Sequence, residues 1–177
     1  MELRTFTPDQ EADLQSLLES DPGYTERVTG YPPGPSDALS LTVTRPEGVG
    51  EHQKYVLGAW RPGPGDRDDL VGVVDLIRGY PDPSYAFVGL LLVRWELQGT
   101  GVGREIWQHA EELVAGWDEI SRVRLAVVQT NAGMALGFWK AMGFEETGER
   151  KPYRYDQLES TAILLEKPVC RRLVTDE

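Results

Sequence analysis

Three alternating glycines, Gly99, Gly101 and Gly103, follow the apolar stretch 85–93 and open the amphipathic stretch 101–116. Glycine removes the side chain where a backbone must approach a ligand closely. The helix that follows such a loop presents unpaired N–H groups and a partial positive charge, which can bind a phosphate even in an acidic protein. The pattern therefore predicts either a phosphate-binding loop or only a tight turn from strand to helix.

The glycine spacing does not fit two common nucleotide-binding motifs. The dinucleotide fingerprint requires Gly-x-Gly-x-x-Gly and an acidic ribose ligand that ends the next strand, whereas the next predicted strand here ends at Gln129. A P-loop requires Gly-Lys-Ser/Thr, whereas Gly103 is followed by Arg104. A nucleotide-binding domain of either kind is therefore disfavoured.

The elements that must position this loop can be predicted from hydrophobic periodicity and turn residues. Helices are expected after Pro8-Asp9 and at 101–116 and 132–142, and strands at 3–6, 54–60, 70–78, 85–93, 123–129 and 161–166. The early strands have short connections and predict an antiparallel meander, whereas strand and helix alternate later. This order predicts a mixed α/β (α+β) fold whose sheet is antiparallel first and partly parallel later.

Residues 21–50 are rich in proline and glycine and hold too few apolar residues for a core of their own. We expect a loop-rich excursion with short helices. It could cover a substrate, or it could simply be solvated. Residues 1–168 are expected to form a single domain, and 169–177 a short C-terminal tail.

The composition excludes several classes of function. The 177 residues include 18 lysines and arginines against 29 aspartates and glutamates, which gives a net charge of −11. Non-specific binding to nucleic acid or to anionic membranes is therefore not expected. One cysteine and two distant histidines predict neither a disulfide framework nor a metal site. We see no signal peptide or membrane-spanning run, and we expect a cytoplasmic protein.

A family resemblance emerges from two linked motifs. The pattern Leu91-x-Val93-x-x-x-x-Gln98-Gly99-x-Gly101-x-Gly103 resembles the acetyl-CoA signature of the GNAT superfamily of N-acetyltransferases, whose core is Arg/Gln-x-x-Gly-x-Gly/Ala. Downstream, Asn131, Ala135, Phe138-Trp139 and Gly143-Phe144 resemble that superfamily's Asn…Ala…Phe-Tyr…Gly-Phe helix, with a spacing from Asn131 about one residue longer than usual. The resemblance covers essentially residues 3–168.

The resemblance implies a mostly antiparallel sheet flanked by helices and splayed between the fourth and fifth strands. The pantetheine arm of acetyl-CoA would lie in this splay, with a backbone N–H near Val93 polarising the thioester carbonyl. The glycine loop would hold the pyrophosphate. The implied coenzyme-binding residues are Leu91, Leu92, Val93, Gln98, Gly99, Thr100, Gly101, Val102, Gly103, Arg104, Asn131, Phe138 and Trp139.

Acetyl transfer to an amine requires that the amine lose a proton and that the departing thiolate gain one. Much of the superfamily uses a tyrosine after the helix phenylalanine as the thiolate's acid, but here that position is Trp139, whose indole N–H is a poor proton source. Asp75, Tyr80 and Tyr153 are therefore the candidate catalytic residues, each with an ordinary structural role as the alternative. Water or the outgoing ammonium could also supply the proton.

We therefore predict an N-acetyltransferase that moves an acetyl group from acetyl-CoA to a primary amine in a ternary complex. The acceptor could be a small molecule or a protein amine, and the acidic segment 1–50 favours a cationic one. Relatives often dimerise, which leaves a homodimer open. The alternative is a non-catalytic acyl-CoA-binding or regulatory module on the same fold, because Trp139 stands where the usual tyrosine acid would be.

Overall fold

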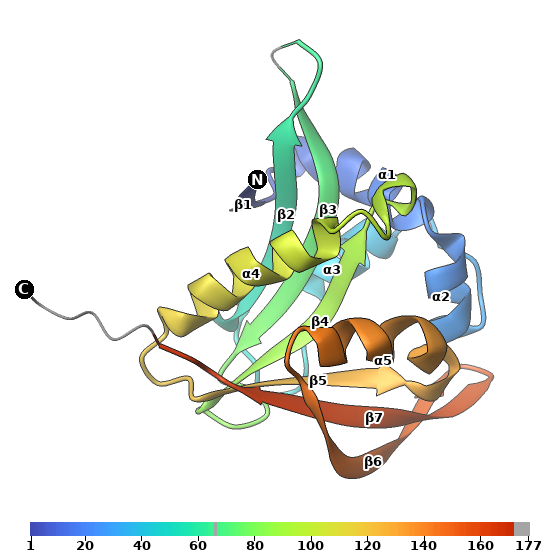
Figure 1. Ribbon diagram of the computed structural model, residues 1–177. Coiled ribbons are helices and arrows are strands. Elements are labelled where there is room, and N and C mark those ends of the chain that lie inside the picture. Colours follow the sequence, from blue (N-terminus) through green and yellow to red (C-terminus); the bar gives the residue numbers. More distant parts are fainter. Residues whose placement is uncertain (66, 172–177) are drawn as a thin grey trace, which may run out of the picture.

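A seven-stranded sheet forms the centre of the molecule in the computed structural model, which describes residues 1–65 and 67–171 (Figure 1). The strand order is β1-β2-β3-β4-β5-β7-β6. The strands are β1 (Glu2–Thr5), β2 (Lys54–Pro62), β3 (Asp68–Arg78), β4 (Tyr85–Val93), β5 (Arg122–Val128), β6 (Glu145–Tyr155) and β7 (Leu158–Pro168). Every neighbouring pair is antiparallel except β4 and β5, which are parallel. The mixed, mostly antiparallel sheet is thereby confirmed.

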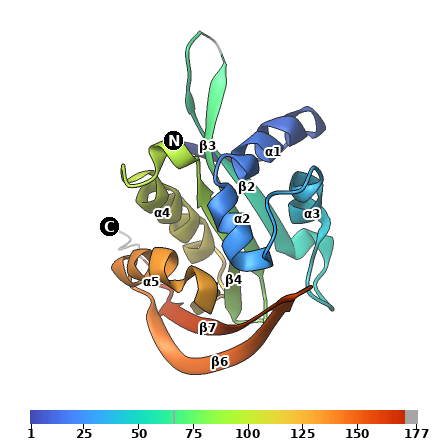
Figure 2. The same ribbon diagram turned by 90° about the vertical axis from the view of Figure 1, so that its right-hand side faces the viewer.

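Five α-helices flank the sheet on its two faces (Figure 2). They are α1 (Glu11–Glu19), α2 (Pro22–Thr29), α3 (Asp37–Val43), α4 (Val102–Ala115) and α5 (Ala132–Ala141), and short 3-10 turns occur at Pro8–Gln10, Glu51–Gln53, Trp95–Leu97 and Gln129–Asn131. Helices α1 and α3 pack over one core cluster, built on Leu14, Leu17 and Val73. Helices α4 and α5 pack over the larger cluster on the opposite face. None of the described helices is both long and apolar enough to cross a membrane.

The amphipathic pattern of α4 explains why this helix lies against the sheet. Val102, Ile106, Ala110 and Val114 recur every four residues and are all buried. Such spacing places them on one stripe of the helix. The stripe fixes the N-terminus of α4 at the end of β4, next to the glycine loop.

The parallel strands β4 and β5 are paired over only part of their length. Their register runs from Tyr85 opposite Arg122 to Val88 opposite Leu125 and then stops. Strand β5 continues with β7 as far as Val128. Beyond Val88, β4 therefore presents an unpaired edge toward β5, and the predicted splay between the fourth and fifth strands is confirmed.

A bulge in β4 lies at the start of this splay. On the β3 side, Asp75 is opposite Leu90 and Leu76 is opposite Val88, so Gly89 between them has no partner residue on β3. A bulge of this kind bends a strand and redirects its side chains. The bulge accompanies the point where β4 leaves β5.

The structure adds one strand that the sequence patterns did not predict. Strand β6 is missing from the expected list because its residues are nearly all exposed and polar, without the alternation of a half-buried strand. It is an edge strand, where charged residues and Pro152 limit unwanted pairing. The segment 21–50 contains the short helices α2 and α3, as expected, and residues 172–177 of the expected tail lie outside the described residues.

Candidate functional site

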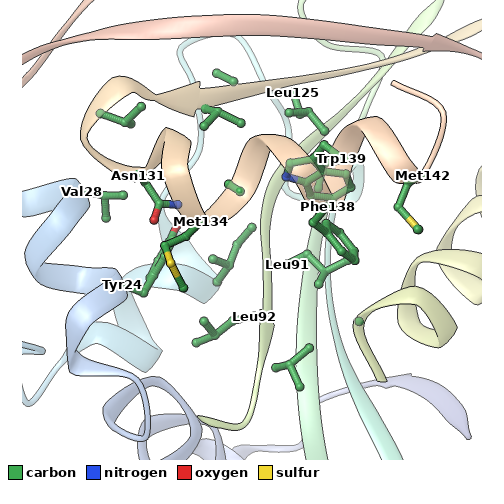
Figure 3. Close-up of a pocket in the computed structure, with 18 of the residues that line it drawn as sticks. Tyr24, Val28, Leu91, Leu92, Leu125, Asn131, Met134, Phe138, Trp139 and Met142 are labelled. Atoms are coloured by element: carbon green, nitrogen blue, oxygen red, sulfur yellow. The ribbon is translucent and has the colours of Figure 1, made fainter. Parts of the chain in front are cut away.

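A cavity of about 770 Å³ follows the splay of the sheet and reaches the glycine loop before α4. Its walls come from β4, β5, the glycine loop, α2 and α5. Figure 3 shows Tyr24, Val28 and Asn131 at one end and Phe138 and Trp139 at the other. Every predicted coenzyme-binding residue lines this first cavity except Thr100 and Val102.

The glycine loop leaves the start of α4 open to a ligand. Gly99 and Gly101 have φ values of 75° and 93°, a left-handed conformation that favours glycine. Gly101 is the N-cap of α4, and no side chain caps this end. The first intrahelical bond runs from the Glu105 N–H to the Gly101 carbonyl, 3.1 Å. The preceding amides are therefore donors without an intrahelical acceptor.

Three other loop residues serve packing and loop geometry. A Cβ atom at Gly103 would lie 3.2 Å from Phe138 Cε2 and 3.4 Å from Val93 Cγ2, so glycine there lets α4 approach β4 and α5 closely. The Val102 side chain is buried in the core. The Thr100 hydroxyl donates to the Leu97 carbonyl at 2.6 Å.

Gln98 connects the N-terminus of α2 to the glycine loop. Its side-chain amide donates to Asp21 Oδ2 at 2.9 Å and to the Val93 carbonyl at 3.2 Å. Asp21 is buried, and its Oδ1 accepts from the Tyr24 N–H at 3.1 Å, which makes it the N-cap of α2. A single carboxylate thus joins the glycine loop to α2.

The other end of α2 is tied to the 3-10 turn after β5 and to β6. Arg27 Nε donates to the buried Asn131 Oδ1 at 2.7 Å, and the Thr130 hydroxyl donates to the Arg27 carbonyl at 2.5 Å. The Tyr153 hydroxyl donates to the Val28 carbonyl, also at 2.5 Å. Helix α2 therefore spans the splay, anchored on both sides of it.

Aromatic side chains form the α5 wall of the cavity. Trp139 packs edge-on against Trp107 and Phe144, with ring centroids 5.5 and 5.2 Å apart, and it is 8% exposed. Phe138 lies beside it, 4.9 Å between centroids. Trp139 therefore belongs to the core cluster while one part of it borders the cavity.

Two phenols line the first cavity, Tyr24 and Tyr153. Burial, and the nearby Tyr153, raise the pKa of Tyr24 to about 12. Burial also raises the pKa of Tyr153. Both side chains therefore keep their protons at neutral pH, and the Tyr153 hydroxyl donates to a backbone carbonyl of α2.

The other two candidate catalytic residues lie next to the cavity without lining it. Asp75 is buried, and its Oδ2 is 2.9 Å from Lys54 Nζ, whereas its Oδ1 has no partner among the described residues. Burial raises the pKa of Asp75, although Lys54 opposes that shift. A Cβ at Gly89 would lie 2.4 Å from Asp75 Oδ2, so Asp75 stands directly behind the bulge. Tyr80 packs edge-on against Phe87, and Phe87 lines the cavity.

A second cavity, of about 610 Å³, lies between α2, α3, β4 and the turn between β6 and β7. Tyr24, Val28, Gly89 and Leu90 line both cavities. The remaining polar side chains of the second cavity include Tyr31, Asp37, Tyr155 and Asp156.

Sequence reasoning missed this second cavity together with Tyr24 and Arg27 of the first. One signal was available. Asp21 followed by Pro22 is a favourable N-cap and first position of a helix, which would have predicted α2. Nothing local signals that α2 would cross the splay.

Comparison with known proteins identifies the family. Residues 25–144 match the model described as "Acetyltransferase (GNAT) family". The chain belongs to this family. The match extends from α2 to Phe144 and includes the glycine loop and the aromatic helix, so the two motifs of the resemblance lie within it.

Solved structures confirm the GNAT fold. An acetyltransferase from Thermus thermophilus is 24% identical, with a TM-score of 0.66, and 94% of this chain and 96% of that one are covered. Spermidine N-acetyltransferase from Vibrio cholerae, in complex with CoA and spermine, is 16% identical with a TM-score of 0.69 and 95% coverage of both chains. The ribosomal-protein-S18-alanine N-acetyltransferase from Escherichia coli is 13% identical, with a TM-score of 0.64, and 99% of this chain and 98% of that one are covered. A comparison with curated protein sequences finds no match.

Proposed function

We propose that this GNAT protein transfers an acetyl group from acetyl-CoA to a primary amine by direct attack in a ternary complex. The observation that carries the proposal is the unpaired edge of β4 after Val88, which opens into a cavity that ends at the glycine loop. This cavity offers backbone donors along the β4 edge and at the start of α4, and much of its lining is apolar. Family membership supports acetyl transfer in general, and the amine acceptor and the mechanism are our proposal.

The β4 edge suits the amide-containing arm of the coenzyme. Buried backbone N–H and C=O groups require partners, and residues 89–93 have none from β5. An extended ligand with amides of its own can add to such an edge as a short strand does. Leu91 and Val93 would then contact the arm through backbone atoms while their side chains pack in the core.

The start of α4 suits the pyrophosphate. The open amides there donate toward the loop, and Arg104 lines the same end of the cavity. Gln98 is engaged with Asp21, so we assign it the task of holding the loop and α2 together. Arg27 adds a second positive charge on the α2 side.

The proton balance can be met without a strong acid at Trp139. A C–N bond forms as the C–S bond breaks, one proton leaves the nitrogen for water, and one reaches the sulfur. A thiol near pKa ~8.5 is a good leaving group, and a phenol of pKa about 12 would transfer its proton to that thiolate only uphill. We therefore assign Tyr24 a hydrogen bond to the sulfur, with Tyr153 holding α2 in place and water supplying the proton.

The experiment uses calorimetry with acetyl-CoA and a thiol-release assay with primary amines. Gly101→Val places a side chain in the phosphate position, and Gly48→Val is its matched control. Both glycines have positive φ, 93° and 80°, and a Cβ at either meets nothing within 4 Å. Backbone strain is thus similar, and only Gly101 lines the cavity.

We expect Gly101→Val to raise the acetyl-CoA Kd by about tenfold or more, equivalent to about 1.4 kcal/mol, and Gly48→Val to leave it unchanged. Equal effects of the two variants would contradict the assignment of the phosphate to the loop. Absence of acetyl-CoA binding by the unmodified chain would overturn the whole proposal.

One observation favours a second candidate, a non-catalytic acyl-CoA-binding module. Trp139 is locked into an aromatic cluster where a tyrosine acid would otherwise stand. This alternative predicts acetyl-CoA binding with no thiol release for any amine. Amine-dependent release that falls about tenfold in Tyr24→Phe would exclude it and support the hydrogen bond to sulfur.

A further inference from the structure

The second cavity carries negative charge without a matching positive charge. Among the described residues that line it, Asp37 and Asp156 are charged, and no lysine or arginine is present. Neither carboxylate has an ion-pair partner in the described part of the chain. Arg154 donates to the backbone carbonyl of Asp156, 3.3 Å, and not to its carboxylate. The cavity is therefore suited to a cation from outside the chain.

Aromatic rings accompany these acids. Tyr24, Tyr31 and Tyr155 line the cavity, and Tyr31 donates a hydrogen bond to the Asp156 carboxylate. Tyr31 and Tyr155 are 44% and 50% exposed, so they stand at the open side. The faces of tyrosine rings attract ammonium groups, and carboxylates among them add to that attraction.

The inner end of the cavity meets the proposed site of acetyl transfer. Gly89 and Leu90 line both cavities and lie at the start of the unpaired β4 edge. An amine that enters past Tyr31 and Tyr155 thus passes Asp37 and Asp156 and reaches the β4 edge, where we place the thioester.

We propose, resting on the proposed function, that the acceptor is an aliphatic amine with a second positively charged ammonium group, a diamine or longer polyamine. The reacting nitrogen lies at the Gly89 end. The second ammonium lies between Asp37 and Asp156 beside the tyrosine rings. Acetylation forms the C–N bond at the first nitrogen and leaves the second ammonium unchanged, so the charge that selects the substrate takes no part in the reaction.

Three probes of similar length separate charge from size. Cadaverine carries a second ammonium, pentylamine carries none, and δ-aminovalerate carries a carboxylate in its place. Calorimetry of each probe, with and without CoA, requires no turnover. We expect cadaverine to bind about tenfold more tightly than pentylamine, and δ-aminovalerate to bind most weakly. Equal affinity for cadaverine and pentylamine would overturn the inference.

Asp156→Asn tests the site itself. Asp156 has a φ of 48°, which asparagine tolerates well, and an asparagine oxygen can still accept from Tyr31. We expect the variant to weaken cadaverine binding about fivefold, in the range of a partly exposed charge pair, and to leave pentylamine binding unchanged. Glu159→Gln is the matched control, because Glu159 is an exposed acid of the same hairpin outside both cavities, and it should change neither.

The two proposals fail in distinguishable ways. Selective cadaverine binding without thiol release would contradict the proposed function and leave the cation site standing. Thiol release that favours pentylamine over cadaverine would support an acetyltransferase and overturn the inference about its acceptor. Loss of cadaverine selectivity in Glu159→Gln to the same extent as in Asp156→Asn would also overturn it.

Discussion

The two cavities on either side of α2 have opposite chemistry. The first is lined by Arg27, Arg104 and a single acid, Asp21, which is bound to Gln98, and it includes the amides at the start of α4. The second holds Asp37 and Asp156 among tyrosines and no lysine or arginine among the described residues. They meet at Gly89 and Leu90. One wall of the protein can therefore serve an anionic coenzyme and a cationic acceptor at once, with a reaction centre between them. The net charge of −11 is no obstacle to the coenzyme, because backbone N–H groups do not enter that count.

The difference also shows why one cavity was predictable and the other was not. Eight of the residues that line the first lie in one continuous stretch, 91–104, whose glycines have a local spacing requirement. The second combines α2 and α3 with the turn at Asp156, which lies more than a hundred residues later in the chain. Only the complete fold brings those segments together.

The largest effect is expected at the buried ion pair behind Gly89, which lines both cavities. Lys54→Met should lower the free energy of unfolding by about 3–5 kcal/mol, because it leaves the Asp75 carboxylate buried without its ion pair. Both side chains are nearly inaccessible, at 6% and 7% exposure. Urea unfolding measures the loss. The double variant Lys54→Met/Asp75→Leu should recover most of it, and a double variant as unstable as the single one would contradict this role.

A smaller effect is expected where α2 joins the glycine loop. Asp21→Ala removes the N-cap of α2 and the acceptor of Gln98, and it should lower the free energy of unfolding by about 1–2 kcal/mol. Asp21→Asn retains a capping oxygen and should lose less. If Asp21→Ala weakened acetyl-CoA binding no more than Asp21→Asn does, α2 would not depend on this cap for its position.

The smallest effect is expected at the far anchor of α2. Tyr153→Phe removes the hydrogen bond to the Val28 carbonyl and should lower the free energy of unfolding by about 1 kcal/mol. Its thiol-release rate should fall less than that of Tyr24→Phe, because we assign Tyr153 to positioning. A larger loss of rate in Tyr153→Phe, with stability unchanged, would reverse the two roles.

Much of the fold follows from local patterns. The stripe on α4, the apolar β4 and the breakers around the meander each predict their element. Strand β6 was not predicted because it is held by pairing with β7 and not by burial of its own side chains. Among the predicted coenzyme-binding residues, the Val102 side chain lies in the core, so Val102 can contact the coenzyme only through its backbone amide. The sequence alone could not distinguish the roles of Asp75, Tyr80 and Tyr153, because those roles depend on contacts that only the folded structure shows.

Amide hydrogen exchange with and without CoA is the most direct test of the proposed coenzyme site. When CoA binds, we expect slower exchange at residues 102–104 and at those amides of residues 89–93 that point away from β3, because these amides would gain acceptors. We expect little change at 85–88, which already pair with β5. CoA binding that protects neither the β4 edge nor the start of α4 would contradict the proposed site.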